Sequence, residues 1–214
     1  MFYLVFFAIT MITIVLHEAG HAIMALICGV KVEIFTIGMF RPFIEKKWHG
    51  IKWRFSPWLI GGSVKMSGEN DKSPDGFLVQ PYCKKLLIVL AGVFVNLIIA
   101  LVCYWINYKS FLLGIYIDWV AIKSVFTQNY DDIILLVIFY KPSLFLLQLS
   151  MLNIFCFASN LIPWPALDGS YIFLPWLEYV WKENYVKYLN ITTKIGFWSL
   201  MILQVGLLVW LYLL

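Results

Sequence analysis

The chain has little charge. Of its 214 residues, 13% are Asp, Glu, Lys or Arg and 62% are hydrophobic, and the mean hydropathy is +0.84. A water-soluble domain of this composition would expose large apolar patches, so the scarcity of charge excludes one and predicts an integral membrane protein. The net charge of +4 favours contact with the anionic headgroups of a lipid bilayer, and we expect no nucleic acid partner.

Cysteine is also scarce, and it lacks the spacing of a metal or disulfide site. The four cysteines lie in or beside apolar segments and form no Cys-x-x-Cys pair, which argues against a thiolate zinc site and a disulfide framework. Internal repeats and low-complexity linkers are absent, so we expect one domain over residues 1–214. Because no basic segment precedes the first apolar run, we expect that run to stay attached rather than to be removed as a signal peptide.

Four apolar stretches are long enough to cross about 30 Å of hydrocarbon. They lie near residues 2–28, 86–106, 143–162 and 195–214. Residues 133–139 are either interfacial or an extension of the third stretch. Residues 32–66 alternate short apolar runs with Gly, Pro and charge, which is typical of short strands. We therefore predict an all-α membrane protein with four transmembrane helices and a small membrane-associated β-hairpin or sheet between the first two.

The basic residues are distributed unevenly between the connections. Ten lie in the connection between the first and second stretches, whereas only Lys109 and Lys123 precede Lys141 in the next one. Because short basic loops stay in the cytoplasm, we expect the first connection inside and both termini outside. His17 is then roughly 22 Å down a helix that enters from outside, so the site should lie toward the cytoplasmic face.

Three ionisable residues, His17, Glu18 and His21, interrupt the first apolar stretch. An ionisable group at membrane depth is costly, which marks a functional site. On a helix the two histidines share one face at the spacing that lets two imidazoles bind one zinc ion. Glu18 can then act as a general base toward an attacking water molecule. The alternative is that these residues merely satisfy one another inside a helix bundle.

A third metal ligand is expected after the third apolar stretch. Pro163 and Pro165 cannot continue its helix, and irregular backbone at membrane depth is tolerated only where it lines a cavity. A catalytic zinc ion takes three protein ligands and keeps one open position, which makes Asp168 the predicted third ligand. The alternative is that Asp168 caps a helix that begins near Gly169. Asn160, at the same break, either binds substrate backbone, which we favour, or satisfies the freed carbonyl groups.

These segments resemble the site-2 protease family of intramembrane zinc metalloproteases. The resemblance rests first on the His-Glu-Ala-Gly-His motif at 17–21 and on the Asn-to-Gly segment at 160–169. Residues 61–66 are similar to the GGxVKM strand of bacterial members that cleave anti-sigma factors and remnant signal peptides. Residues 91–96 are similar to their AGPxxN segment. Together the matching segments span most of the chain.

The chain departs from the family pattern in three places. Val93 stands where Pro is usual, Ser170 stands where a second Gly is common, and the region around Asp118 is too short for the PDZ domain of many relatives. The resemblance therefore implies a compact protease core without a PDZ domain, in a bacterial cell membrane. It also implies Zn²⁺ as the cofactor and a transmembrane segment of a membrane protein or signal peptide as the substrate.

The alternating segment and the family likeness also suggest how a substrate is held. An exposed strand edge can pair with an unwound substrate segment, whereas the alternative is a hairpin that only anchors the loop. The edge residues are Gly62, Ser63, Val64, Lys65 and Met66. Asn96, a lone polar residue in its apolar stretch, is better explained by a bond across helices, although the family likeness allows a role on the substrate side.

The sequence thus predicts an intramembrane zinc endopeptidase that hydrolyses peptide bonds in transmembrane segments, as in regulated intramembrane proteolysis. One alternative is a non-catalytic membrane protein that holds a partner segment at the strand edge, for which Glu18 would be dispensable. A zinc or proton transporter would need ionisable residues on several spans. Because residues 86–106 and 195–214 contain no charged residue, we rank that alternative last.

Overall fold

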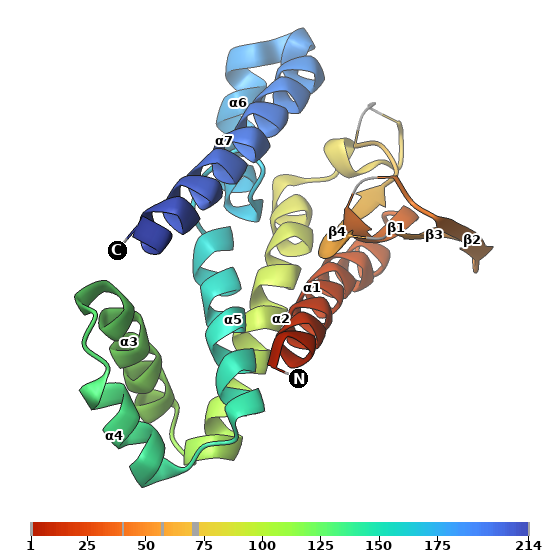
Figure 1. Cartoon of the computed structure of the whole chain (residues 1–214). Coiled ribbons are helices and arrows are strands. Elements are labelled where there is room, and N and C mark those ends of the chain that lie inside the picture. Colours follow the sequence, from red (N-terminus) through yellow and green to blue (C-terminus); the bar gives the residue numbers. More distant parts are fainter. Residues whose placement is uncertain (1, 40, 57, 70–72, 214) are drawn as a thin grey trace.

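Three helices form the centre of the molecule. The computed structural model describes residues 2–39, 41–56, 58–69 and 73–213. The helices α1 (Phe2–Ile27), α2 (Tyr82–Tyr108) and α5 (Leu144–Asn160) pack side by side, with α2 against both of the others (Figure 1). Inside this bundle the Asn153 side chain donates a 3.0 Å hydrogen bond to Thr13 Oγ1. Because both residues are buried, this bond holds α5 against α1 one turn before His17.

Two helices in the described part of the chain are long and apolar enough to cross a membrane. They are Leu4–Ile27, with 24 residues, and α2, with 27. α5 is apolar but has 17 residues, about 26 Å at 1.5 Å per residue, which is slightly short of the usual span. The predicted membrane helices near 2–28 and 86–106 are therefore supported by length and composition. Four spans remain a proposal.

Helices α3 (Phe111–Thr127) and α4 (Asp131–Tyr140) form a hairpin between α2 and α5 (Figure 1). The first was not expected from the sequence, although the Ser110 side chain caps it by accepting a bond from Leu113 N–H. Residues 133–139 lie in α4, a helix separate from α5, so they do not extend the third stretch, and an interfacial position stays a prediction. α4 ends at Tyr140 and is capped by Lys141, whose φ is 45°, and Pro142 then prevents continuation into α5.

A four-stranded sheet lies at the C-terminal end of α1, as predicted for residues 32–66 (Figure 1). Its strands are β1 (Val32–Met39), β2 (Ile44–Trp48), β3 (Ile51–Phe55) and β4 (Trp58–Met66). The order is β2-β3-β1-β4, with β1 parallel to β3 and antiparallel to β4. Buried side chains of β1 and β4 pack on the end of α1 in one apolar core. Within the described strands, β4 is therefore an edge strand that lies against α1.

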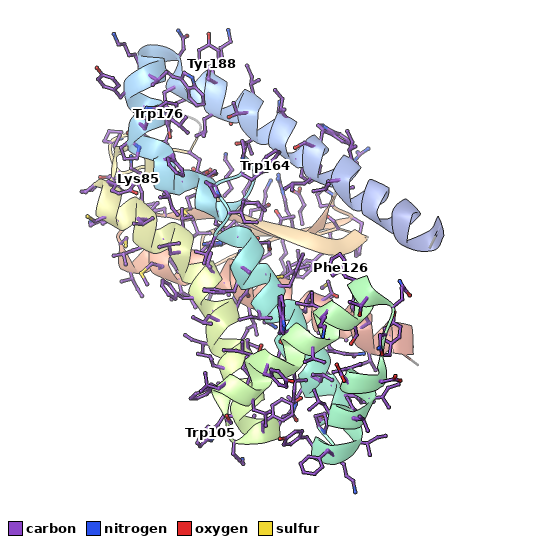
Figure 2. The ribbon with its side chains drawn as sticks, turned by 90° about the vertical axis from the view of Figure 1, so that its left-hand side faces the viewer. Lys85, Trp105, Phe126, Trp164, Trp176 and Tyr188 are labelled. Carbon is purple, nitrogen blue, oxygen red and sulfur yellow. The ribbon has the colours of Figure 1, made fainter. Side chains whose placement is uncertain are left out.

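The chain after α5 is irregular until a short 3₁₀ helix, η2 (Asp168–Phe173), and then forms α6 (Leu174–Trp181) and α7 (Tyr185–Leu213). α7 begins ten residues before the predicted span at 195–214. It holds the irregular segment in place, since the Trp164 indole N–H donates to Ser199 Oγ at 3.2 Å. At the other side Lys85 forms an ion pair with Glu178 at 3.5 Å and so joins the start of α2 to α6. Figure 2 shows Trp164 between the helices and Lys85 and Trp105 near opposite ends of α2.

Candidate active site

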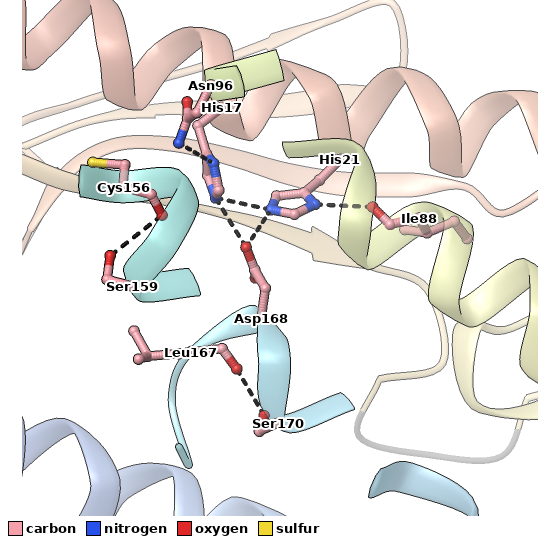
Figure 3. A network of polar contacts seen from close by, with 9 residues as sticks. All are labelled: His17, His21, Ile88, Asn96, Cys156, Ser159, Leu167, Asp168 and Ser170. Carbon is pink, nitrogen blue, oxygen red and sulfur yellow. Dashed lines mark hydrogen bonds and ion pairs between the residues drawn. The ribbon is translucent and has the colours of Figure 1, made fainter. Parts of the chain in front are cut away.

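The two histidines of α1 converge as their spacing predicts. His17 Nε2 and His21 Nε2 lie 3.1 Å apart, with the two rings nearly perpendicular at 89°. His21 is buried, and the side chain of His17 is 12% exposed. One turn of helix therefore presents two imidazole nitrogens to a single point (Figure 3).

Asp168 reaches that point from the far end of the chain. Its Oδ2 lies 3.1 Å from His17 Nε2 and 3.3 Å from His21 Nε2. The residue does begin η2, but its carboxylate faces the imidazoles, which favours the ligand interpretation over a helix cap. The three ligand atoms lie within 4.8 Å of one another. Two His and one carboxylate are the three protein ligands of many catalytic zinc sites.

The hydrogen bonds of His21 leave a lone pair for a metal. His21 Nδ1 lies 2.9 Å from the main-chain oxygen of Ile88. A carbonyl oxygen only accepts, so Nδ1 carries a proton, and in the neutral ring the lone pair is then on Nε2. This lone pair faces the Asp168 carboxylate, whose buried Oδ2 has no ordinary hydrogen-bond partner. Electron pairs so close together repel unless a cation lies between them, so the donor set fits a metal ion.

Asn96 of α2 is the side chain that contacts Nδ1 of His17, as the Ile88 carbonyl contacts Nδ1 of His21. Its amide nitrogen Nδ2 lies 3.1 Å from His17 Nδ1, and the residue is buried. A 180° turn of this amide group places Oδ1 there instead, which satisfies an otherwise unpartnered buried oxygen. Oδ1 then accepts from Nδ1–H, and the Nε2 lone pair of His17 is free for a metal. The expected bond across helices is therefore present, and it is made to a candidate zinc ligand.

Glu18 points the other way, toward β4. The main-chain N–H of Val64 donates to its carboxylate. Gly62 makes this approach possible, since a Cβ atom there would lie 3.0 Å from Glu18 Cγ and 2.9 Å from Ile14 Cγ2. Glu18 and Asp168 line one cavity of about 210 Å³. The base is thus enclosed between the candidate metal ligands and the edge strand.

Most of the predicted strand-edge residues also line this cavity. Its β4 members are Gly62, Ser63, Val64 and Met66. The Lys65 side chain instead forms an ion pair with Glu33 of β1, at 3.0 Å, so only its main chain belongs to the edge. Asn160 is the last residue of α5 and is not among the residues that line the cavity. Its predicted contact with substrate backbone stays a prediction.

The structure adds residues that sequence reasoning missed. Tyr171, Thr193 and Glu69 line the same cavity, and the Ile88 carbonyl orients His21. A main-chain carbonyl has no sequence signature. Burial raises the pKa of the Glu69 carboxyl to about 7.

Comparison with known proteins agrees with this geometry. The sequence model of Peptidase family M50 matches residues 5–203. A protein of Campylobacter jejuni is 39% identical over 95 residues, which are 41% of this chain and 26% of that protein. A protein of Neisseria meningitidis is 37% identical over 112 residues (50% and 25%), and one of Clostridium acetobutylicum is 38% identical over 97 residues (44% and 29%).

Each of these three relatives carries the name "Putative zinc metalloprotease". The matched region spans less than a third of each relative's own length. The family match, in contrast, covers nearly the whole chain, and zinc is the metal of this family. The chain belongs to peptidase family M50, the site-2 protease family.

Proposed function

We propose that this chain is an intramembrane zinc endopeptidase that hydrolyses peptide bonds in transmembrane segments, as in regulated intramembrane proteolysis. One observation carries the proposal. Glu18 lies between a set of three zinc-compatible ligand atoms and the edge of strand β4, in a cavity that it lines together with His21 and Asp168. A base, a metal site and a surface for an extended peptide are the three parts that metal-assisted peptide hydrolysis requires.

His17, His21 and Asp168 would hold the zinc ion, which supplies polarisation of the scissile carbonyl and activation of water. Glu18 accepts the proton of the attacking water and delivers it to the leaving amine. The Ile88 carbonyl and Asn96 keep the imidazole rings in the orientation that directs each Nε2 toward Asp168.

The position of β4 at the edge of the sheet supports the substrate class. A transmembrane helix must be unwound before a protease reaches its peptide bonds, and main-chain pairing with an edge strand offsets the hydrogen bonds that unwinding breaks. Successive residues of an antiparallel strand direct their N–H groups alternately toward the partner and away from it. Because the Val64 N–H reaches Glu18 and not β1, positions 62, 64 and 66 are the ones that face the site.

Val64→Pro tests this pairing, because proline removes the donor while an outward-facing edge position tolerates the ring. We expect it to weaken binding of an extended substrate-derived peptide by about tenfold, the effect of leaving one hydrogen bond unmade. Binding would be measured in a Glu18→Ala background, in which the Val64 N–H is not engaged by the base. Val64→Ala is the matched control, with near-normal binding and zinc content. If alanine weakens peptide binding as much as proline does, or if proline does not weaken it, edge pairing is rejected.

We place the cavity toward the cytoplasmic side of a bacterial cell membrane, with four spans and both termini outside. The site lies in the C-terminal half of α1, next to the sheet that carries many of the basic residues of the first connection. Basic connections face the cytoplasm. A transmembrane segment of a membrane protein or a remnant signal peptide is the proposed partner in the bilayer.

Cysteine labelling tests this topology. Single cysteines at Lys47 in β2 and Lys109 after α2, both exposed, would be introduced into a chain without the four native cysteines. In intact cells an impermeant maleimide is expected to label position 109 and to reach position 47 only after permeabilisation. Labelling at 47 alone would place the sheet and the cavity on the outer side.

The function itself is tested with the full chain in lipid nanodiscs and a synthetic transmembrane segment. We expect hydrolysis that a chelator stops and that added zinc restores. If the chain binds the segment but leaves it intact with zinc present, it is the non-catalytic binding protein considered above.

A further inference from the structure

Glu69 lies in the turn after β4 and has no part in the mechanism described above. Its carboxylate oxygen Oε1 accepts a 2.7 Å hydrogen bond from the main-chain N–H of Met66, and the residue lines the same cavity as Glu18 and Asp168. A hydrogen bond of a backbone amide to a carboxylate is stronger than one to a neutral acceptor.

This bond occupies a position that a substrate strand needs. Val64 and Met66 are two residues apart in β4, and the register with β1 shifts opposite Met66, so the direction of the two N–H groups follows from their own bonds. The Val64 N–H is engaged by Glu18 and the Met66 N–H by Glu69. A strand added at this edge would place a carbonyl oxygen about 7 Å along from Val64, where Glu69 Oε1 now lies.

The turn that carries Glu69 is anchored on both sides. The Ser67 N–H donates to the Lys31 carbonyl at 2.8 Å, and the Phe77 N–H donates to the Ser67 carbonyl at 2.7 Å. Gly68, with a φ of 72°, lies so close to Gly76 that a Cβ atom would collide with it. The local backbone thus holds Glu69 over the strand edge. Burial raises the pKa of its carboxyl, in agreement with an enclosed position.

We infer that Glu69 is an intramolecular competitor of the substrate, which caps the edge of β4 at Met66 and must be displaced before a substrate strand extends past Val64. This inference deepens the proposed function and rests on it. The cap weakens the binding of long extended segments, because they must displace Glu69 from the Met66 N–H. It leaves the chemical step at Glu18 unchanged. It also keeps the edge from pairing with unrelated chains while no substrate is present.

The experiment measures KM and kcat for the full chain in nanodiscs with two synthetic substrates cut at the same bond. The long substrate extends beyond the residue that faces Val64, so that it also reaches Met66. The short substrate ends before it reaches Met66. In Glu69→Ala the Met66 N–H is free, so we expect KM for the long substrate to fall by about three- to tenfold at unchanged kcat. The short substrate should show no change. Glu69→Gln keeps an acceptor and should fall between wild type and Glu69→Ala for the long substrate.

The possible outcomes separate the two proposals. If wild type cleaves neither substrate, the proposed function fails. If wild type cleaves both but Glu69→Ala leaves KM for the long substrate unchanged, the competition is wrong. A raised KM in Glu69→Ala would also reject it and would show that Glu69 binds the substrate or only stabilises the turn. A fall in KM for both substrates alike would reject the assignment of the cap to Met66.

Discussion

Glu18→Gln is expected to lower cleavage of a transmembrane substrate by at least roughly a hundredfold while zinc content stays near one ion per chain. Gln has nearly the shape of Glu and can still accept the Val64 hydrogen bond, but it cannot take a proton from the attacking water. Cleavage rate and metal content would be measured on the same purified samples by product analysis and elemental analysis.

Glu45→Gln is the matched control for this substitution. Glu45 lies in β2, at the far edge of the sheet from β4, and pairs with Lys52 and Arg54 on the surface. The same loss of charge there should change the rate by no more than about twofold, since exposed ion pairs contribute little. Unchanged cleavage in Glu18→Gln would remove Glu18 from the mechanism and leave the binding-protein alternative standing.

Gly92→Ala is expected to lower zinc affinity by roughly a hundredfold and to abolish cleavage with it, although Gly92 is not a ligand. A methyl group on this residue of α2 would lie 2.5 Å from His21 Nε2 and 2.9 Å from the main-chain oxygen of His17. The imidazole cannot turn aside freely, because its Nδ1 is held by the Ile88 carbonyl. Displacing a zinc ligand or its supporting contacts has effects of this size.

Gly206→Ala in α7 is the control for Gly92→Ala, because a Cβ atom there would meet nothing within 4 Å. Both substitutions raise helix propensity by the same amount, so a difference between them reports the close approach of α1 and α2 at the site. Zinc affinity would be measured by competition with a chromophoric chelator. Normal affinity in Gly92→Ala would mean that the helices are farther apart than described.

The candidate site could be predicted from sequence where its signals were local. Helical periodicity brings His17 and His21 to one face, and the broken helix before Asp168 marks irregular backbone that needs a cavity. The partners of the imidazoles were harder to assign, since Ile88 contributes a main-chain oxygen 67 residues away from His21. Asn96 gave a usable signal as a lone polar residue among apolar ones, but its partner depended on how α2 packs against α1.

The fold, like the site, could be predicted from local sequence signals but not where it depends on contacts between distant segments. Hydropathy measures how apolar a segment is and not where a helix begins, so the last span was expected at 195 although α7 starts at Tyr185 and passes through polar residues. α3 was missed because Asp118 and Lys123 interrupt its apolar run. Asp118 is in fact buried, where it accepts a 2.5 Å hydrogen bond from the Tyr104 hydroxyl of α2. That partner lies in another helix, so the local sequence could not reveal it.

The most direct measurement of the central claim is the position and chemistry of the cut. The zinc-loaded chain would be incubated in nanodiscs with a synthetic transmembrane segment in ¹⁸O-labelled water, and the products identified by mass spectrometry. We expect two fragments that share one added water, with ¹⁸O in the new carboxyl group and the cut inside the apolar segment. Neither fragment should form with Glu18→Gln. Cleavage only outside the apolar segment, or fragments that persist with Glu18→Gln, would contradict intramembrane hydrolysis at the site of His17, His21 and Asp168.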